Sequence, residues 1–230
     1  MPYNHPAINR IKQRIAANPG INAHELTESL KKDMKTMSDL MYMTEGRTRR
    51  IYALGDGKAV LKIAKAGGES QNIDEAKVFE CSGTKFFAEV YDSDPKGRWL
   101  VMERVITNDG AKTRKLWSWF GKTSRFTDML VLVYAIRRGK TPELIATIEN
   151  NKESNQEVKD EAIEWVNEFV KITDQCKVNT NDLHSGNVGI RESTNRLVLI
   201  DYADYNLTDQ DDGISSESVS LKELIYAAGN

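Results

Sequence analysis

The sequence predicts an α+β protein with a small antiparallel-sheet lobe that carries one helix, a larger lobe that is mainly helical, and a helical extension ahead of both. Three patterns support this prediction. Residues 7–35 show helical periodicity, residues 49–64 and 86–105 each contain two apolar runs separated by a turn signal, and residues 107–176 hold further helix-like stretches. We therefore expect three parts, which are an extension over residues 1–36, a small lobe over 37–106 and a reduced larger lobe over 107–230.

The composition is that of an ordinary folded protein. Hydrophobic residues make up 40% of the 230 residues and charged residues 29%, which is the balance of a globular domain rather than of a disordered chain. The formal net charge is only −2, so the chain as a whole has no strong field for nucleic acid or for a membrane. A site for a polyanion would have to come from a local cluster of basic residues.

The sequence favours a soluble, cytoplasmic protein with no membrane partner. No basic segment followed by an apolar segment opens the chain, and no apolar run reaches the roughly 20 residues that a membrane helix needs. The two cysteines, Cys81 and Cys176, lie far apart and lack metal-ligand spacing. We therefore expect two reduced thiols.

The N-terminal extension is predicted to contain two helices, because isoleucines and leucines recur at helical spacing on both sides of Pro19-Gly20. A third helix is expected around residues 35–44. Together with the hairpin that follows, these helices would also fit a winged helix-turn-helix, whose basic wing would consist of Arg47, Arg49 and Arg50. The simpler interpretation is a helical cap on the small lobe.

The small lobe begins with a predicted hairpin whose turn is Gly55-Asp56-Gly57. Its second strand places Lys62 between apolar neighbours. Such a lysine either lies at a solvated sheet edge or directs a cation at anionic phosphates. The helix-like segment 71–80 follows and offers Glu75 or Glu80 as an ion-pair partner for this lysine.

A second hairpin is expected further along the small lobe. The apolar runs 86–91 and 99–105 are separated by the polar, glycine-containing segment 92–97. Together, the two hairpins and the helix between them form a small lobe rich in β-structure.

Two segments near the end of the chain, 179–190 and 197–204, carry the most informative polar residues. Phosphoryl transfer needs a carboxylate to orient the attacking hydroxyl, oxygen ligands for magnesium and a cation on the phosphates. Asp182 can supply the carboxylate and Asn187 a neutral oxygen ligand. Asp201 directly follows a short apolar run, so a buried strand would position a second carboxylate.

The apolar runs on either side of residues 191–196 can pair as a hairpin, which would bring Asn187 and Asp201 to a common end. The alternative interpretation is an Asn- and Asp-rich loop selected for turn geometry. The presence of Lys62 and Glu75 upstream, which adds a cation for the phosphates and a partner to hold it, favours the catalytic interpretation.

The string Asp182-Leu183-His184-Ser185-Gly186-Asn187 resembles the catalytic loop of the protein-kinase-like superfamily. Its D-L-H-x-x-N wording is closer to the aminoglycoside-phosphotransferase branch than to kinases with H-R-D. The string is also similar to the catalytic loop of the early protein kinase of short-tailed bacteriophages. The resemblance extends over residues 40–206 and implies a bilobal, protein-kinase-like fold that binds ATP and Mg²⁺ between its lobes.

The resemblance also assigns roles to the polar residues singled out above. It implies that Lys62 binds the α- and β-phosphates and that Glu75 is its partner on the helix. It implies that Asp182 is the catalytic base. Asn187 and Asp201 are the implied metal ligands.

Two further segments would bind the nucleotide. Residues 100–105 resemble the hinge between kinase lobes, which implies that Met102 is the gatekeeper and that the backbones of Glu103 and Val105 bind adenine. Gly46 is what remains of the glycine-rich loop that covers the phosphates in the family. Arginines crowd the rest of that loop here.

The chain departs from the family pattern at other places too. Asn181 precedes the implied base, and Tyr202-Ala203 replaces the Phe-Gly that follows the metal-binding aspartate in kinases. Only residues 202–230 follow Asp201, which is too little chain for the usual substrate-binding helices. Substrate recognition would then come from residues 107–176.

The leading prediction is a protein Ser/Thr kinase whose substrates are host proteins or the chain itself, acting in the host cytoplasm if the chain is viral. One alternative is a small-molecule kinase of the aminoglycoside type. The other is a binding protein, either a pseudokinase that inhibits a partner or a winged-helix protein that binds DNA through residues 1–64.

Overall fold

The computed structural model describes residues 3–34, 39–107, 135–136, 138–152, 155–178, 187–194 and 196–202. The chain divides into two compact units, Met1–Val105 and Ile106–Asn230. Helices and an antiparallel five-stranded sheet occur together, which confirms the predicted α+β class.

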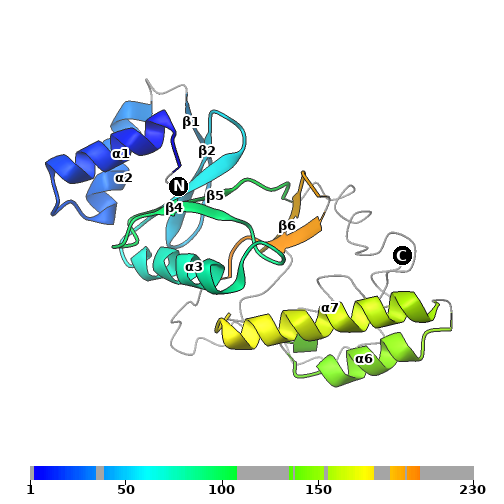
Figure 1. Cartoon of the computed structure of the whole chain (residues 1–230). Coiled ribbons are helices and arrows are strands. Elements are labelled where there is room, and N and C mark those ends of the chain that lie inside the picture. Colours follow the sequence, from blue (N-terminus) through cyan, green and yellow to red (C-terminus); the bar gives the residue numbers. More distant parts are fainter. Residues whose placement is uncertain are drawn as a thin grey trace. The chain divides into compact units, whose positions relative to one another are not determined.

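The first unit combines this sheet with three helices. The helices are α1 (Pro6–Ala17), α2 (Ala23–Met34) and α3 (Glu69–Ser82), and the strands are β1 (Leu40–Glu45), β2 (Arg49–Leu54), β3 (Ala59–Ala64), β4 (Val90–Ser93) and β5 (Trp99–Glu103). The strand order is β1-β2-β3-β5-β4, and every neighbouring pair is antiparallel (Figure 1).

The two predicted N-terminal helices are confirmed, and their ends follow from local chemistry. At the start of α1, the His5 side chain accepts a hydrogen bond of 3.2 Å from the Ala7 N–H. At the start of α2, the Glu25 N–H donates to Asn22 Oδ1 over 2.9 Å, and the Asn22 N–H donates to Glu25 Oε2 over 3.1 Å. This reciprocal pair is a capping box that satisfies amide groups at the helix start.

Side-chain alternation gives the sheet two differently covered faces. Leu61 and Ile63 of β3 lie in one buried cluster with Trp99 and Val101 of β5 and with apolar residues of α1 and α2. Lys62 points to the opposite face, where it contacts α3. The pair α1–α2 and the single helix α3 therefore cover opposite faces of the sheet (Figure 1).

The expectation of a third helix around residues 35–44 is wrong. Leu40–Glu45 form β1, which pairs with β2 through a ladder that is shifted between Tyr42 and Thr44. Pairing with β2 places Leu40 opposite Leu54 and buries it in the core, a tertiary contact that outweighs the local helix propensity. The three-helix arrangement of a winged helix is therefore not formed by the described part of residues 1–64.

The second predicted hairpin is present, but its first strand starts later than expected. β4 begins at Val90, and the buried residues Phe86, Phe87 and Ala88 precede it as a loop segment. β4 and β5 pair antiparallel across a turn in which Gly97 has a φ of +73°. A left-handed backbone of this kind favours glycine.

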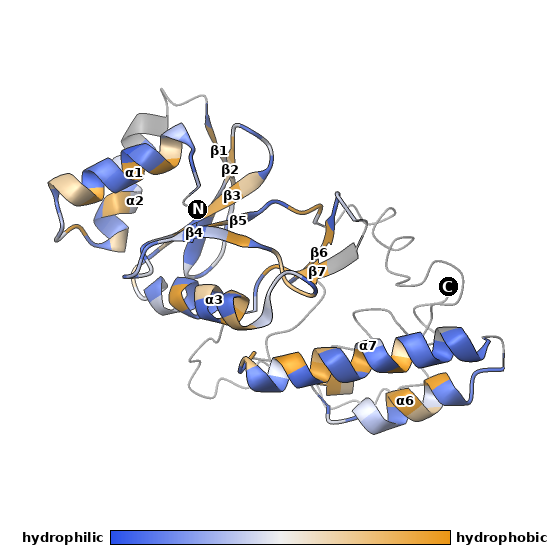
Figure 2. Cartoon of the chain, in the orientation of Figure 1, coloured by the Kyte–Doolittle hydropathy of each residue, from blue (hydrophilic) through white to orange (hydrophobic). Residues whose placement is uncertain are grey.

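The second unit contains a pair of helices and a short hairpin. Its elements are α6 (Thr141–Glu149), α7 (Gln156–Gln175), β6 (Val188–Arg191) and β7 (Arg196–Leu199). Helical spacing places Trp165, Val166 and Phe169 of α7 on a buried stripe, and Figure 2 shows hydrophobic patches along α6 and α7 between hydrophilic ones. Among the described residues, no helix combines the length and the apolar character that crossing a bilayer requires.

Candidate functional site

The first unit contains a buried ion pair between the sheet and α3. Lys62 Nζ on β3 lies 2.9 Å from both Oε1 and Oε2 of Glu75 on α3. Lys62 is 5% exposed and Glu75 is 0% exposed. Of the two glutamates that the sequence offered, Glu75 is thus the observed partner of this lysine, and not Glu80. The roles of both residues toward a nucleotide stay predictions.

Arg49 is a third member of this cluster, and sequence reasoning missed its position. Its Nη1 lies 2.9 Å from Glu75 Oε2, and the residue is 4% exposed. Arg49, Lys62 and Glu75 are called the cation cluster below. Arg49 is not part of a basic surface wing, since β2 directs it toward the same face as Lys62.

Burying the charged groups of the cation cluster costs free energy, so its presence needs an explanation other than stability. Removing ions from water costs several kcal/mol for each ion, on the order of what their mutual attraction returns. Apolar residues could have stabilised the same interface without this cost. Stability alone therefore does not account for the cation cluster, which makes it a candidate functional site.

The inner face of α3 is polar over most of its length. Gln71, Asn72 and Glu75 are buried on this face, and Val78 is the buried apolar residue of the helix. Gln71 Oε1 accepts a hydrogen bond of 2.7 Å from Thr48 Oγ1. Asn72 Nδ2 donates to the Gly97 carbonyl over 2.8 Å. Hydrogen bonds and charges, rather than apolar contacts, therefore position α3.

Two glycines allow α3 to approach the sheet closely. A Cβ at Gly68 would lie 2.2 Å from the Thr48 carbonyl oxygen, and a Cβ at Gly97 would lie 2.1 Å from the Glu69 carbonyl oxygen. Real Cβ atoms do not approach oxygen so closely, so both positions require a residue without a side chain. The start of α3 therefore packs closely against both the β1–β2 turn and the β4–β5 turn.

Gly46 lies in the tight turn between β1 and β2. Its N–H donates to the Arg49 carbonyl over 2.9 Å, and its carbonyl accepts a hydrogen bond of 2.6 Å from Lys65 Nζ. Since the Gly46 N–H is already donated inside the turn, a phosphate contact by Gly46 would have to replace that bond. The predicted role of Gly46 in cofactor binding remains a prediction.

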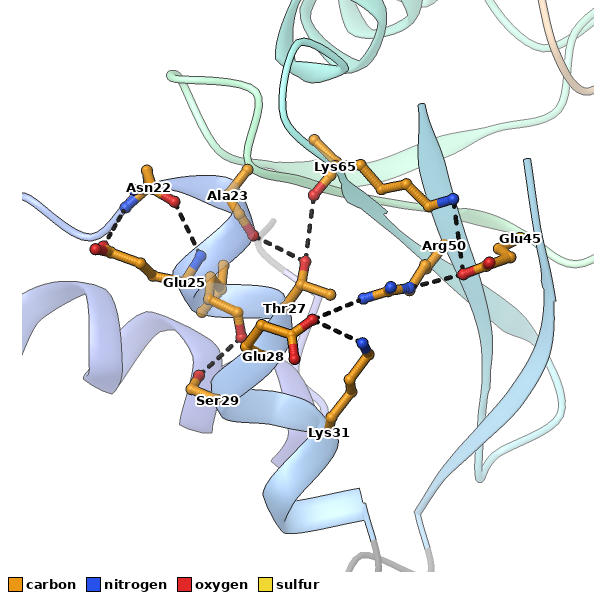
Figure 3. A network of polar contacts seen from close by, with 12 residues as sticks. Asn22, Ala23, Glu25, Thr27, Glu28, Ser29, Lys31, Glu45, Arg50 and Lys65 are labelled. Atoms are coloured by element: carbon orange, nitrogen blue, oxygen red, sulfur yellow. Dashed lines mark hydrogen bonds and ion pairs between the residues drawn. The ribbon is translucent and has the colours of Figure 1, made fainter. Parts of the chain in front are cut away.

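A polar network joins the strands beside this turn to α2 (Figure 3). Arg50 donates to Glu45 Oε2 over 2.8 Å, lies 3.4 Å from Glu28 Oε1 on α2, and thereby spans two elements. The hydrogen bond from Arg50 holds the pKa of the Glu45 carboxyl below its usual range. Lys65 Nζ is 3.7 Å from the same Glu45 carboxylate.

The residues assigned to the hinge lie at the end of β5 and just beyond it. Met102 is buried and pairs with Val60 of β3. The Glu103 N–H donates to the Glu89 carbonyl over 2.7 Å, and Glu103 Oε2 accepts a hydrogen bond of 3.1 Å from the Glu89 N–H. The Glu103 amide is thus already hydrogen-bonded to the residue that precedes β4. The assignment of adenine to the backbones of Glu103 and Val105 stays a prediction.

In the second unit, the predicted hairpin brings the two proposed metal ligands to one end. Val188 pairs with Leu199, and the Ile200 N–H donates to the Asn187 carbonyl over 2.9 Å. Asp201 follows directly. Asn187 is buried and Asp201 is partly buried.

At this end of the hairpin Asn187 lies opposite Ile200. The Asn187 amide and the Asp201 carboxylate are therefore one residue apart across the two strands. Oxygen donors of this kind suit Mg²⁺. Asp182 lies outside the described residues. Groups of three or more His, Cys, Asp or Glu that could hold a metal do not occur within the described ranges.

The expectation of two reduced thiols is wrong for this structure. Neither Cys81 nor Cys176 is a free thiol.

No protein-family profile and no curated protein matches the chain. Several solved structures of aminoglycoside phosphotransferases are similar to it at low identity. The streptomycin–ATP–APH(2'')-IIa ternary complex has a TM-score of 0.35 and 15% identity, and covers 78% of this chain and 72% of that chain. ADP-bound APH(2'')-Ib has a TM-score of 0.35 and 14% identity, and covers 77% of this chain and 71% of that chain. A thermostable mutant of APH(4)-Ia in its apo form has a TM-score of 0.35 and 15% identity, and covers 77% of this chain and 72% of that chain.

Proposed function

We propose that the chain is an ATP- and Mg²⁺-dependent phosphotransferase with a protein-kinase-like fold. The observation that carries the proposal is the buried pair in which Lys62 Nζ lies 2.9 Å from both oxygens of Glu75. A lysine held in this way by a carboxylate on the facing helix keeps its charge and its direction. That is what a group needs in order to bind the α- and β-phosphates of ATP.

The second unit supports the proposal with oxygen donors. Asn187 and Asp201 at the end of the β6–β7 hairpin fit Mg²⁺, because the ion prefers hard oxygen ligands and uses few protein groups. The bound ion would neutralise charge on the phosphates. In the proposal, Asp182 orients the attacking hydroxyl and accepts its proton.

Protein Ser/Thr is the substrate class that we propose first. The likeness of residues 182–187 to the phage early kinase supports it, and host proteins or the chain itself would be phosphorylated in the cytoplasm where ATP is present. The runner-up is a small-molecule kinase, which the D-L-H-x-x-N wording of the same residues favours. That enzyme would phosphorylate a hydroxyl of a cationic amino sugar.

The deciding experiment incubates the purified chain with γ-labelled ATP and Mg²⁺, with and without cell lysate. We expect labelled phosphoserine or phosphothreonine from the unaltered chain and none from Asp182→Ala or Asp201→Ala. Asp174→Ala is the matched control, because Asp174 is an exposed residue of α7. Transfer that persists in both Asp182→Ala and Asp201→Ala would refute the assignment.

A second assay separates the two substrate classes. ATP consumption is measured with a panel of aminoglycosides and amino sugars in place of lysate. Stimulation by one of them, without labelled protein, would replace the protein kinase by the small-molecule kinase. A chain that neither binds ATP in a calorimetric titration nor transfers phosphate would remove the proposed function altogether.

A further inference from the structure

We propose that Arg49 is a positioning residue that holds Glu75 toward Lys62 and thereby fixes α3 on the sheet. Its effect on nucleotide binding rests on the proposed function, whereas its effect on α3 does not. The reason to single it out is that Glu75 Oε2 is contacted by both Lys62 and Arg49, each at 2.9 Å.

The two cations reach the carboxylate from different strands. Arg49 begins β2 and Lys62 lies in β3, and the strands pair with Ile51 opposite Lys62. Since side chains alternate along a strand, Arg49 and Ile51 lie on the same face, the one that α3 covers. Two donors at separate points of a rigid sheet restrict the carboxylate more than one flexible lysine can, and the planar guanidinium adds directional hydrogen bonds.

Apart from the cation cluster, α3 is held by hydrogen bonds of Gln71 and Asn72 and by Cys81, which is not a free thiol. The inner face of the helix is polar, and Val78 is its buried apolar residue. Arg49 Nη1 also lies 3.4 Å from Asn72 Oδ1, and Asn72 in turn donates to the Gly97 carbonyl. Arg49 therefore contacts two successive turns of the inner face of α3, one at Asn72 and one at Glu75.

The charge of Arg49 also matters for a ligand. Lys62 and Glu75 carry opposite charges, and Arg49 adds a second positive charge beside the carboxylate. An added positive charge at this position favours a polyanion such as a triphosphate. Removing Arg49 should therefore weaken ATP binding through the loosened pair as well as through the lost charge.

The first test compares Arg49→Met, Arg49→Lys and the control Arg14→Met. Arg14 lies on α1, where it donates to Ser29 Oγ, and α1 covers the other face of the sheet. We expect Arg49→Met to lower kcat/KM for ATP roughly ten- to a hundredfold, as for the loss of a charge-assisted hydrogen bond. Arg49→Lys should recover part of the loss, and Arg14→Met should leave kcat and KM unchanged.

The second test needs no nucleotide. Urea unfolding is measured for Arg49→Met, for the isosteric Glu75→Gln, and for the double variant. If Arg49 acts through Glu75, the double variant should be less destabilised than the two single effects added together, with a coupling of about tenfold in the unfolding constant. Lys31→Met paired with Glu75→Gln is the control cycle, because Lys31 pairs with Glu28 on α2, and it should show additive effects.

The two proposals fail in different ways. Absence of ATP binding and phosphate transfer in the unaltered chain would remove the proposed function, and the unfolding cycle would still judge the role of Arg49. An active chain in which Arg49→Met keeps the unaltered kcat/KM would overturn the positioning role. Additive effects in the Arg49–Glu75 cycle would overturn it as well.

Discussion

Replacing Gly97 by alanine should loosen α3 without touching a charged group. The added Cβ would lie 2.1 Å from the Glu69 carbonyl oxygen and 2.9 Å from Ile73 Cγ1, both in the first turns of α3. Gly97 also has a φ of +73°, which alanine adopts reluctantly. The helix start, the β4–β5 turn or both must therefore move.

The structure allows the two costs to be separated. A left-handed backbone costs a non-glycine residue about 1–2 kcal/mol. Overpacking against a backbone that cannot move away adds roughly 1–3 kcal/mol. Gly97→Ala should therefore lower the free energy of unfolding by about 2–5 kcal/mol, on the sum of these two contributions.

Gly57→Ala is the matched control, because Gly57 has a φ of +71° and no atom within 4 Å of its added Cβ. It should lose about 1–2 kcal/mol, which is the backbone contribution alone. Both variants are compared by urea unfolding followed by tryptophan fluorescence. Equal losses in the two variants, within about 0.5 kcal/mol, would show that α3 does not press on Gly97 and would refute the reasoning.

Three further predictions use the same urea assay. The pKa of Asp94 is subject to two opposing influences: burial raises it, and the hydrogen bonds from Arg98 outweigh burial and hold it below its usual range. A lowered folded-state pKa adds stability that is fully present above the unfolded value of about 3.9. This stability is lost as the pH falls through the folded value, so Asp94→Asn should flatten the acid limb of stability below about pH 4. Parallel acid limbs for the two proteins would contradict this prediction. Phe169→Ala should cost about 3–5 kcal/mol because the ring is fully buried on α7, while Lys171→Ala on the exposed side of that helix should cost less than about 0.5 kcal/mol. Thr27→Val should cost about 1 kcal/mol, since the buried hydroxyl donates to carbonyls of α2 and β3, and an unchanged midpoint would show that these bonds do not contribute.

Local patterns were enough to predict much of the small lobe. The D-G turn and the alternation around it indicate the β2–β3 hairpin, whereas the sequence left open whether Lys62 lies at a solvated sheet edge or is directed at phosphates. The helix after β3 offered both Glu75 and Glu80 as partners of Lys62, and only the structure identifies Glu75. The β6–β7 hairpin is equally local, since two short apolar runs flank a polar turn.

The position of Arg49 could not be predicted from its neighbours, because it depends on a contact with α3, which lies farther along the sequence. Arg47, Arg49 and Arg50 look like one basic group in the sequence, but the strand separates them. Arg49 is buried against α3, and Arg50 pairs with Glu28 and Glu45 beside α2. The alternation of β2 could have separated Arg49 from Arg50, because Arg49 has the parity of Ile51 and Arg50 that of Tyr52. It could not have identified Glu75 as the partner of Arg49.

The error at residues 35–44 has a similar cause. Leucine, methionine and lysine in this segment are good helix formers. The strand forms because β2 offers an edge to pair with, and that edge exists only after the chain has folded.

The polar inner face of α3 has a consequence for hydrogen exchange. Lifting this helix from the sheet exposes little apolar surface, and water can replace many of its hydrogen bonds, so opening costs less than unfolding β3 or β5. The amides of α3 should then exchange by a local opening, ahead of those in the central strands. In this respect the first turns of α3 can open while the sheet and the cluster beneath α1 and α2 stay intact, whereas its last turn is tethered through Cys81, which is not a free thiol.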